Sequence, residues 1–218
     1  MPNQPTIPPA VGRLLAGLRA FRATYYEQRP EPLRKLVDSG QHPEVLVIAC
    51  SDSRVDPAIL TNAEPGDLFV VRNVANLVPP YETGGRFHGV SAALEFAILN
   101  LRVKHLVVMG HSGCGGIKAA LDQTAARETE AHFISKWMSM LDEARLSVLA
   151  AYQMRPLAER MRALEMEGIR ASLKNLRTFP CVQALEAKGR IELHGAHFDI
   201  ASGTLSVLNH QSGKFYAL

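Results

Sequence analysis

The sequence predicts an α/β fold in which helices flank a mostly parallel central β-sheet. Three short apolar segments rich in β-branched residues predict buried strands, at 44–49 (EVLVIA), 67–71 (DLFVV) and 105–109 (HLVVM). A helical period covers residues 89–101, between the second and the third of these strands. Continuous apolar strands that alternate with helices indicate parallel pairing, because antiparallel strands half open to water would alternate polar and apolar side chains.

The two ends of the chain complete this prediction. Residues 11–26 place leucines and aromatic residues at helical spacing, which predicts an amphipathic helix within an N-terminal helical arm over residues 1–30. Segment 116–176 is mainly helical in period. Segments 191–200 and 204–208 predict two strands, and the turn-forming residues between them predict a C-terminal antiparallel hairpin.

Composition predicts a single domain over residues 1–218. Of the 218 residues 47% are hydrophobic, enough for one complete core. The 24 basic and 21 acidic residues form no long block of one sign, so we expect no nucleic-acid partner. No apolar run reaches about 18 residues and the N-terminus lacks a secretory pattern, so we expect no membrane association and a cytoplasmic location. Three cysteines are too few for a disulfide framework, which also favours a reducing compartment.

Polar motifs follow two of the predicted strands. Residues 50–54 (CSDSR) come directly after the first strand, and residues 111–116 (HSGCGG) follow the third. In an open parallel sheet, ligand sites form outside the carboxyl ends of the strands. The two motifs are therefore expected to meet in space although they are far apart in the sequence.

Together the motifs offer the donors of a zinc site. Cys50 and Cys114 supply two thiols and His111 supplies an imidazole. These donors bind zinc strongly, and three protein ligands leave the fourth tetrahedral position for water, which is typical of a catalytic site. The nearest candidate for a fourth ligand is Asp52, and the guanidinium of Arg54 is suited to hold that carboxylate away from the metal. The sequence therefore predicts one Zn²⁺ per chain.

The remaining cysteine is interpreted as structural, and so are the remaining histidines as far as metal binding is concerned; a proton shuttle among these histidines stays open and is not assigned to a residue. Cys181 follows Pro180 in a helical segment and is expected to be a core thiol. No other pair of histidines has a spacing that favours metal binding over a structural role. The histidines outside the two motifs are His42, His88, His105, His132, His194, His197 and His210.

At the two motifs the sequence resembles the β-class carbonic anhydrases, whose metal motifs are C-x-D-x-R and H-x-x-C. The likeness extends over residues 33–210, and joint motifs of this kind are a specific signal. It includes the segments 64–67 (EPGD), 71–76 (VRNVAN), 110–118 (GHSGCGGIK) and 172–180 (SLKNLRTFP).

The resemblance implies an activity and roles for named residues. It implies a lyase (carbonate dehydratase) that hydrates CO2 reversibly to bicarbonate and a proton, by attack of zinc-bound hydroxide on CO2. Cys50, His111 and Cys114 match the family's zinc ligands, and Asp52 and Arg54 match its catalytic dyad. In that dyad the aspartate accepts a hydrogen bond from the zinc-bound hydroxide.

The resemblance also suggests a subclass. Some members close their site with a bicarbonate-binding triad of tryptophan, arginine and tyrosine. The matching positions here are Val47, Arg72 and Phe198, so only the arginine is kept and we expect a plant-type-like site without this lock. The substrate pocket that the resemblance implies comprises Gln41, Phe69, Val74, Phe96 and Gly115.

Family assembly adds a prediction about partners. The family is built from dimers whose N-terminal helices wrap the partner, so we expect a homodimer or a dimer of dimers, that is, a homotetramer. Gln41 is then expected to reach the substrate from the neighbouring subunit, and Gln41→Ala should weaken turnover.

Two alternatives stay open at this point. A hydrolase of CS2 or COS would use the same zinc chemistry on the same scaffold, and access to the pocket would decide between the substrates. A non-catalytic zinc-binding module would result if Asp52 closed the metal site. The presence of Arg54 and the absence of a fourth soft ligand in the motifs argue against the module.

Overall fold

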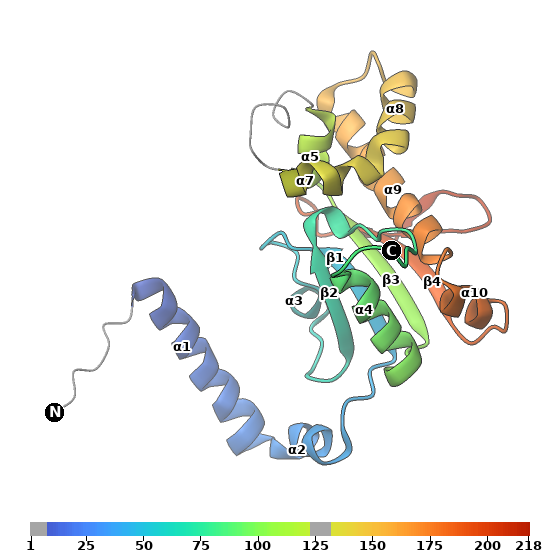
Figure 1. Ribbon diagram of the computed structural model, residues 1–218. Helices are drawn as coiled ribbons and strands as arrows, with labels where there is room; N and C mark the ends of the chain where they lie inside the picture. The colour runs from blue at the N-terminus through green and yellow to red at the C-terminus, as the bar shows by residue number, and fades with distance from the viewer. Residues whose placement is uncertain (1–7, 123–131) are drawn as a thin grey trace. The chain divides into compact units, whose positions relative to one another are not determined.

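The computed structural model describes residues 8–122 and 132–218, and the chain forms two compact units, residues 1–41 and 42–218 (Figure 1). In the first unit, α1 (Pro9–Arg22) continues into the π-helical segment η1 (Ala23–Gln28), and α2 (Pro30–Ser39) follows. Both α-helices begin with proline, whose fixed φ suits the first helical position. The predicted helix over 11–26 is therefore present, and it is longer than the apolar period indicates.

The second unit contains a six-stranded sheet with the order β2-β1-β3-β4-β5-β6. The first four strands in this order pair in parallel, and the last two pair antiparallel. The mostly parallel sheet and the C-terminal hairpin of β4 and β5 are thus confirmed. The strands are β1 (Val45–Cys50), β2 (Leu68–Asn73), β3 (His105–His111), β4 (Glu192–Phe198), β5 (Leu205–Leu208) and β6 (Phe215–Ala217).

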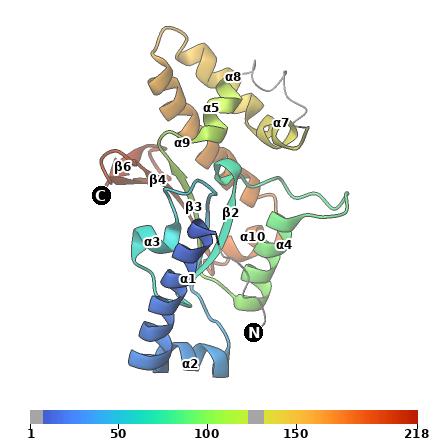
Figure 2. The same ribbon diagram turned by 90° about the vertical axis from the view of Figure 1, so that its left-hand side faces the viewer.

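Helices fill the connections between the strands and the long segment before β4. Figures 1 and 2 both show α5, α7 and α8 together beyond the carboxyl ends of the parallel strands, while α4 and α10 lie beside the sheet. The helical elements are α3 (Pro57–Thr61), η2 (Val74–Asn76), α4 (Gly89–Glu95), η3 (Phe96–Leu101), α5 (Gly115–Leu121), α7 (His132–Met138), η4 (Ser139–Leu141), α8 (Asp142–Ala151), α9 (Leu157–Leu176) and α10 (Pro180–Glu186). No helix in the described parts of the chain is both long and apolar enough to cross a membrane.

The main core lies between one face of the sheet and α4, η3, α9 and α10. Leu46 and Leu106 come from β1 and β3, and both are fully buried in this core. Helix α9 packs closely on the sheet because β3 and β4 carry glycines beneath it. A Cβ at Gly110 or at Gly195 would lie 2.9 Å from a side-chain carbon of Ile169. These glycines therefore set how near α9 lies to the strand ends that carry the site.

The opposite face of the sheet carries a smaller cluster of buried residues. Val47, Ala49, Met109 and Ala196 form it, and Leu60 of α3 packs against it. Because side chains alternate between the two faces of a strand, neighbouring residues of β1 contribute to different clusters. A third cluster surrounds the carboxyl ends of the strands and includes Cys50 and Cys114. The sequence motifs thus lie in a packed region.

Sequence reasoning missed the last strand. β6 pairs with β5 through only three residues, and two of them are exposed, so its apolar pattern is weak. The predicted single domain and the boundary of its arm at residue 30 stay predictions, and this arm falls within the first unit.

Candidate metal centre

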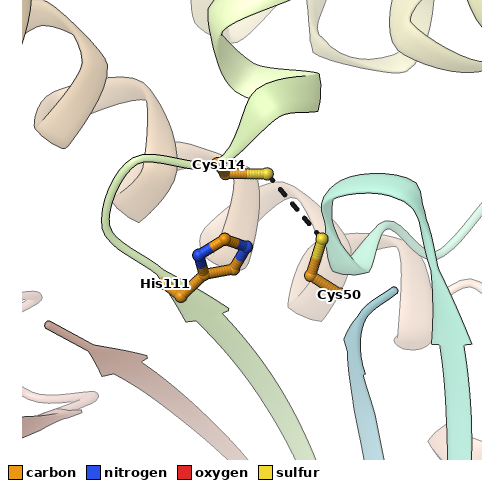
Figure 3. Close-up of side chains that lie close together, drawn as sticks. All are labelled: Cys50, His111 and Cys114. Atoms are coloured by element: carbon orange, nitrogen blue, oxygen red, sulfur yellow. Dashed lines mark hydrogen bonds between the residues drawn. The ribbon is translucent and has the colours of Figure 1, made fainter. Parts of the chain in front are cut away.

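The two polar motifs lie at adjacent strand ends. β1 and β3 are neighbours in parallel register, with Ala49 opposite Met109, so Cys50 at the end of β1 lies beside the end of β3. His111 is the last residue of β3, and Cys114 precedes the first turn of α5. Figure 3 shows the three side chains directed toward one another from these elements.

The three donor atoms are close enough for one metal ion. The sulfurs of Cys50 and Cys114 are 3.9 Å apart, and all three donor atoms lie within 4.8 Å of one another. In a tetrahedral site with Zn–S bonds of about 2.3 Å, two sulfurs lie about 3.8 Å apart. The residues are 1–5% exposed, so an ion among them would be shielded from bulk water.

His111 provides a second indication that the site suits a metal. Its Nδ1 lies 3.0 Å from the carbonyl oxygen of Ser112, to which it donates a hydrogen bond. This bond leaves the lone pair on Nε2, which is buried and has no hydrogen-bond partner among the described residues. Buried polar atoms without a hydrogen-bond partner are uncommon, so this nitrogen is suited to bind a metal ion. The donor set of two thiols and one imidazole fits Zn²⁺.

The two thiols are coupled by a hydrogen bond (dashed line in Figure 3). Either sulfur could be the donor; with Cys114 as the donor, the bond lowers the pKa of Cys50 well below that of an ordinary thiol. The same bond, together with burial, raises the pKa of Cys114. Because a thiolate is the form of cysteine that binds metals, the pairing favours the binding form at Cys50.

Asp52 is held by Arg54 through three hydrogen bonds. The guanidinium donates to both carboxylate oxygens, with Nε 2.9 Å from Oδ1 and Nη2 2.7 Å from Oδ2, and the Arg54 backbone N–H donates to Oδ1 at 3.0 Å. The side-chain hydrogen bond is the largest cause that lowers the pKa of Asp52, so this carboxylate is ionised at neutral pH. Arg54 Nη2 also lies 3.3 Å from the carbonyl oxygen of Gly113, which connects the two motifs.

Arg72 holds the chain that follows β1. Its Nε donates to the carbonyl oxygen of Cys50 at 2.9 Å and its Nη2 to that of Asp52 at 2.7 Å. Its Nη1 is paired with Asp56, which accepts hydrogen bonds from two backbone N–H groups at the start of α3. This structural role was missed in the sequence, although an aspartate directly before Pro57 is a recognisable helix-capping signal.

A buried carboxylate lies behind the Cys114 motif. Glu165 of α9 accepts hydrogen bonds from the backbone N–H groups of Gly113 at 2.8 Å and Cys114 at 3.4 Å. Its other oxygen lies 3.0 Å from Nε2 of His197, and the side chains of this pair are 2% and 0% exposed. Sequence reasoning named His197 as a structural histidine, but it missed Glu165 and the pairing of the two residues. The available signal was a glutamate on the apolar face of a helix, four residues before the core residue Ile169.

The start of α5 approaches the chain after β2 so closely that only glycine fits at position 116. A Cβ on Gly116 would lie 2.8 Å from Cγ1 of Val74 and 3.1 Å from Cβ of Ala75. Neither neighbour is a long flexible side chain that can move aside. Gly116 therefore fixes the distance between α5, which begins after Cys114, and η2.

We expect Gly116→Ala to lower the free energy of unfolding by about 1–3 kcal/mol, the usual cost of overpacking a core. Gly89→Ala is the matched control, because a Cβ at this first residue of α4 meets nothing within 4 Å. Urea unfolding of both variants measures the difference. Equal stability of the two variants would contradict this account of Gly116.

The predicted pocket residues are distributed over several elements. Val74 packs against Gly116 and is 37% exposed, and Gly115 is the first residue of α5. Phe69 and Phe96 lie against each other, with ring centroids 6.0 Å apart. Gln41 belongs to the first unit. Their roles in binding a substrate stay predictions.

The positions that match the bicarbonate triad have separate surroundings. Val47 is buried in the small cluster on the second face of the sheet. Phe198 ends β4 beside His111 and packs against the cluster that includes Cys50 and Cys114. Arg72 donates hydrogen bonds to the chain after β1, as described above. Cys181 is partly buried against the main core, as expected for a core thiol, and burial raises its pKa.

The fold and the site define a class of protein: an open α/β sheet with a cluster of two thiols and one imidazole at the carboxyl ends of its parallel strands. Comparison with known proteins identifies the family. The sequence model of the carbonic anhydrase family matches residues 45–205. A carbonic anhydrase of Pseudomonas aeruginosa is 39% identical over 210 residues, which is 94% of this chain and 90% of that protein.

Solved structures agree with the sequence relatives. The β-carbonic anhydrase CcaA superimposes with a TM-score of 0.89 at 34% identity, over 96% of this chain and all of that chain. Tetrameric β-carbonic anhydrases of Sordaria macrospora give a TM-score of 0.81 at 31% identity, over 92% and 97% of the two chains. The chain therefore belongs to the β-carbonic anhydrase family, as the motifs predict, and it is an enzyme of the carbonic anhydrase type.

Proposed function

We propose that this enzyme catalyses the zinc-dependent, reversible hydration of CO2 to bicarbonate and a proton. The observation that carries the proposal is the convergence of two thiols with a buried imidazole nitrogen that has no hydrogen-bond partner among the described residues. Cys50, His111 and Cys114 would hold one Zn²⁺ per chain. When bound, zinc supplies a Lewis acid that lowers the pKa of water, so that water becomes a nucleophile near neutral pH.

The residues around the ligands have distinct proposed roles. Asp52 accepts a hydrogen bond from the nucleophile and orients it toward the carbon of CO2. Its ionised carboxylate suits this role, and its two hydrogen bonds to the Arg54 side chain keep it from becoming a fourth ligand. Because two thiolates neutralise the charge of Zn²⁺, the metal should acidify water less than a site with three histidines, whose bound water has a pKa of about 7. Orientation by Asp52 therefore matters more here.

The pocket and its access form the next part of the proposal. Phe69, Val74 and Phe96, with Gly115, provide apolar or small surfaces suited to CO2, which has no charge. The site is open rather than closed by bicarbonate, because Val47 and Phe198 replace the tryptophan and tyrosine of the triad. This combination corresponds to the plant-type-like subclass.

Self-association is also proposed, as a homodimer or a dimer of dimers in the cytoplasm, with residues 1–218 as one domain and residues 1–30 as an arm on the partner. Within the first unit, Leu14 and Leu18 of α1 are exposed, which supports a partner surface for this helix, because exposed leucines at helical spacing are suited to contact another apolar surface. The tetrameric β-carbonic anhydrases of Sordaria macrospora are in keeping with such assembly. Gln41 would then act in the neighbouring subunit.

Two other functions use the same residues. Hydrolysis of CS2 or COS would follow the same chemistry with a different pocket access, and a non-catalytic zinc module would need Asp52 on the metal. The family membership and the pairing of Asp52 with Arg54 favour CO2 hydration over both.

The test combines metal analysis with stopped-flow hydration of CO2 for the parent, Cys50→Ala and Cys181→Ala. We expect one zinc per chain and rapid hydration in the parent. Cys50→Ala should lose zinc and hydrate CO2 near the uncatalysed rate, because two remaining donors do not complete the site. Cys181→Ala removes a thiol that lies outside the cluster, and it should retain both properties.

Each other result points to a different conclusion. One zinc per chain without hydration of CO2 would refute the proposed reaction, and assays with COS and CS2 would then test the first alternative. A parent protein without zinc would refute the proposed metal as well.

A further inference from the structure

A second group of metal-binding side chains lies at the other end of the sheet. His105 is the first residue of β3, and Glu192 and His194 lie at the start of β4. One donor atom from each residue lies within 4.8 Å of the other two. His105 and His111 are at opposite ends of the same strand, so the group is separated from the candidate metal centre by about 20 Å, at about 3.3 Å per residue.

Parallel pairing brings these residues together. His105 is directly opposite Glu192 in the register of β3 and β4, and His194 is opposite Val107. Glu192 and His194 are two residues apart on one strand, so their side chains emerge on the same face. The two histidines are 89 residues apart in the sequence, so local ligand spacing does not reveal the group. The sequence predicts a structural role for these two histidines because their spacing does not favour metal binding, and the structure places them side by side.

The distances within the group match those of a bound transition-metal ion. His105 Nδ1 lies 3.2 Å from His194 Nε2, and these nitrogens lie 3.7 and 3.6 Å from Oε2 of Glu192. The point in the plane of the three atoms that is equidistant from them lies about 2.0 Å from each, and Zn–N and Zn–O bonds are about 2.0–2.2 Å. An ion near this point would reach all three donors with little movement of the side chains.

Charge and exposure are also suited to metal binding. The pKa of His194 is lowered, first by burial and then by the neighbouring His105, so its ring is neutral near pH 7 and offers a lone pair. Glu192 contributes one negative charge, which favours a divalent cation. The side chains of His105, His194 and Glu192 are 39%, 36% and 67% exposed, so an ion can enter from solvent and keep water as further ligands.

We propose that His105, Glu192 and His194 form a second metal site, distinct from the candidate metal centre, for a divalent transition-metal ion such as Zn²⁺, Ni²⁺ or Cu²⁺. Two imidazoles and one carboxylate are typical ligands of these ions, whereas Mg²⁺ and Ca²⁺ prefer sites made of oxygen alone. The competing interpretation is a hydrogen-bonded surface group that binds no metal. The two interpretations differ in the number of ions that each chain binds.

The test titrates Zn²⁺ into the full-length enzyme by isothermal titration calorimetry, after the zinc already bound has been measured by elemental analysis. We expect one further equivalent per chain beyond the ion at Cys50, His111 and Cys114. In His194→Ala the affinity for this further ion should fall by more than about tenfold. Loss of a residue that only hydrogen-bonds to a metal ligand typically lowers metal affinity by about 10–100-fold, and loss of a ligand itself should cost at least as much. Glu192→Gln should weaken it in the same direction.

His88→Ala is the matched control, because His88 directly precedes α4, outside β3 and β4, and its ring contacts the carbonyl oxygen of Gly84. It should leave the further equivalent unchanged. Absence of a further equivalent in the parent, or its retention in His194→Ala, would overturn the proposal. The zinc measured before titration and the rate of CO2 hydration report on the candidate metal centre separately, so failure of the proposed function would be recognised as such.

Discussion

Asp52→Asn is expected to lower the rate of CO2 hydration by about 10²-fold or more, the usual scale for loss of a positioned acid–base group. The variant should retain zinc, because the three proposed ligands are unchanged. The physical reason is the loss of an ionised acceptor. An asparagine offers only one carbonyl oxygen, and its NH2 group would face a donor of Arg54, whereas the carboxylate accepts from Arg54 with both oxygens.

The measurement is stopped-flow hydration with zinc analysis of the same preparations. Asp67→Asn is the matched control, since Asp67 caps a backbone N–H at Glu64 in the loop before β2, away from both motifs. Its rate should stay near that of the parent. Parental activity in Asp52→Asn would show that this carboxylate does not orient the nucleophile, and loss of zinc would show that it helps to hold the metal.

Glu165→Ala is expected to lower the free energy of unfolding by about 3–5 kcal/mol, the range for removing one partner of a buried pair. The change leaves the Gly113 and Cys114 N–H groups without their acceptor and His197 without its carboxylate. Because the same N–H groups position the turn that carries Cys114, zinc affinity should also fall, by about 10–100-fold. Chemical unfolding and competition with a chelator measure the two effects.

Glu167→Ala tests whether these effects depend on burial. Glu167 lies two residues further along α9, and its pair with Arg170 is partly exposed. Such pairs contribute about 0–1 kcal/mol, so this variant should differ little from the parent in stability and zinc affinity. Similar losses in the two variants would indicate that they reflect damage to α9 in general rather than the buried contacts of Glu165.

Much of the fold follows from local patterns in the sequence. The strands β1, β2 and β3 are continuous apolar segments in which every second side chain enters the main core, and such segments stand out without any knowledge of contacts. The hairpin of β4 and β5 follows from a short turn between two apolar segments. Local patterns do not predict β6, because this three-residue edge strand is stabilised by its pairing with β5 rather than by an apolar pattern of its own.

The candidate site is likewise predictable from the sequence only in part. The three donors and the Asp-x-Arg pair lie in two short motifs, and the rule that parallel strand ends gather ligands is enough to bring the motifs together. Arg72, Glu165 and His197 act on the motifs from separate elements. Sequence reasoning names Arg72 and His197 but not these contacts, which depend on how separate elements pack, so only the tertiary structure shows them.

The amino-acid sequence alone therefore predicts the class of fold, the family and the three proposed metal ligands, because each depends on local order along the chain. The tertiary structure establishes which distant groups face one another: Glu165 with the backbone of Gly113 and Cys114, and His105 with His194. The physical reason is that register between strands and packing of α9 on the sheet set these contacts. Both are properties of the whole core, and no short segment of the chain encodes them.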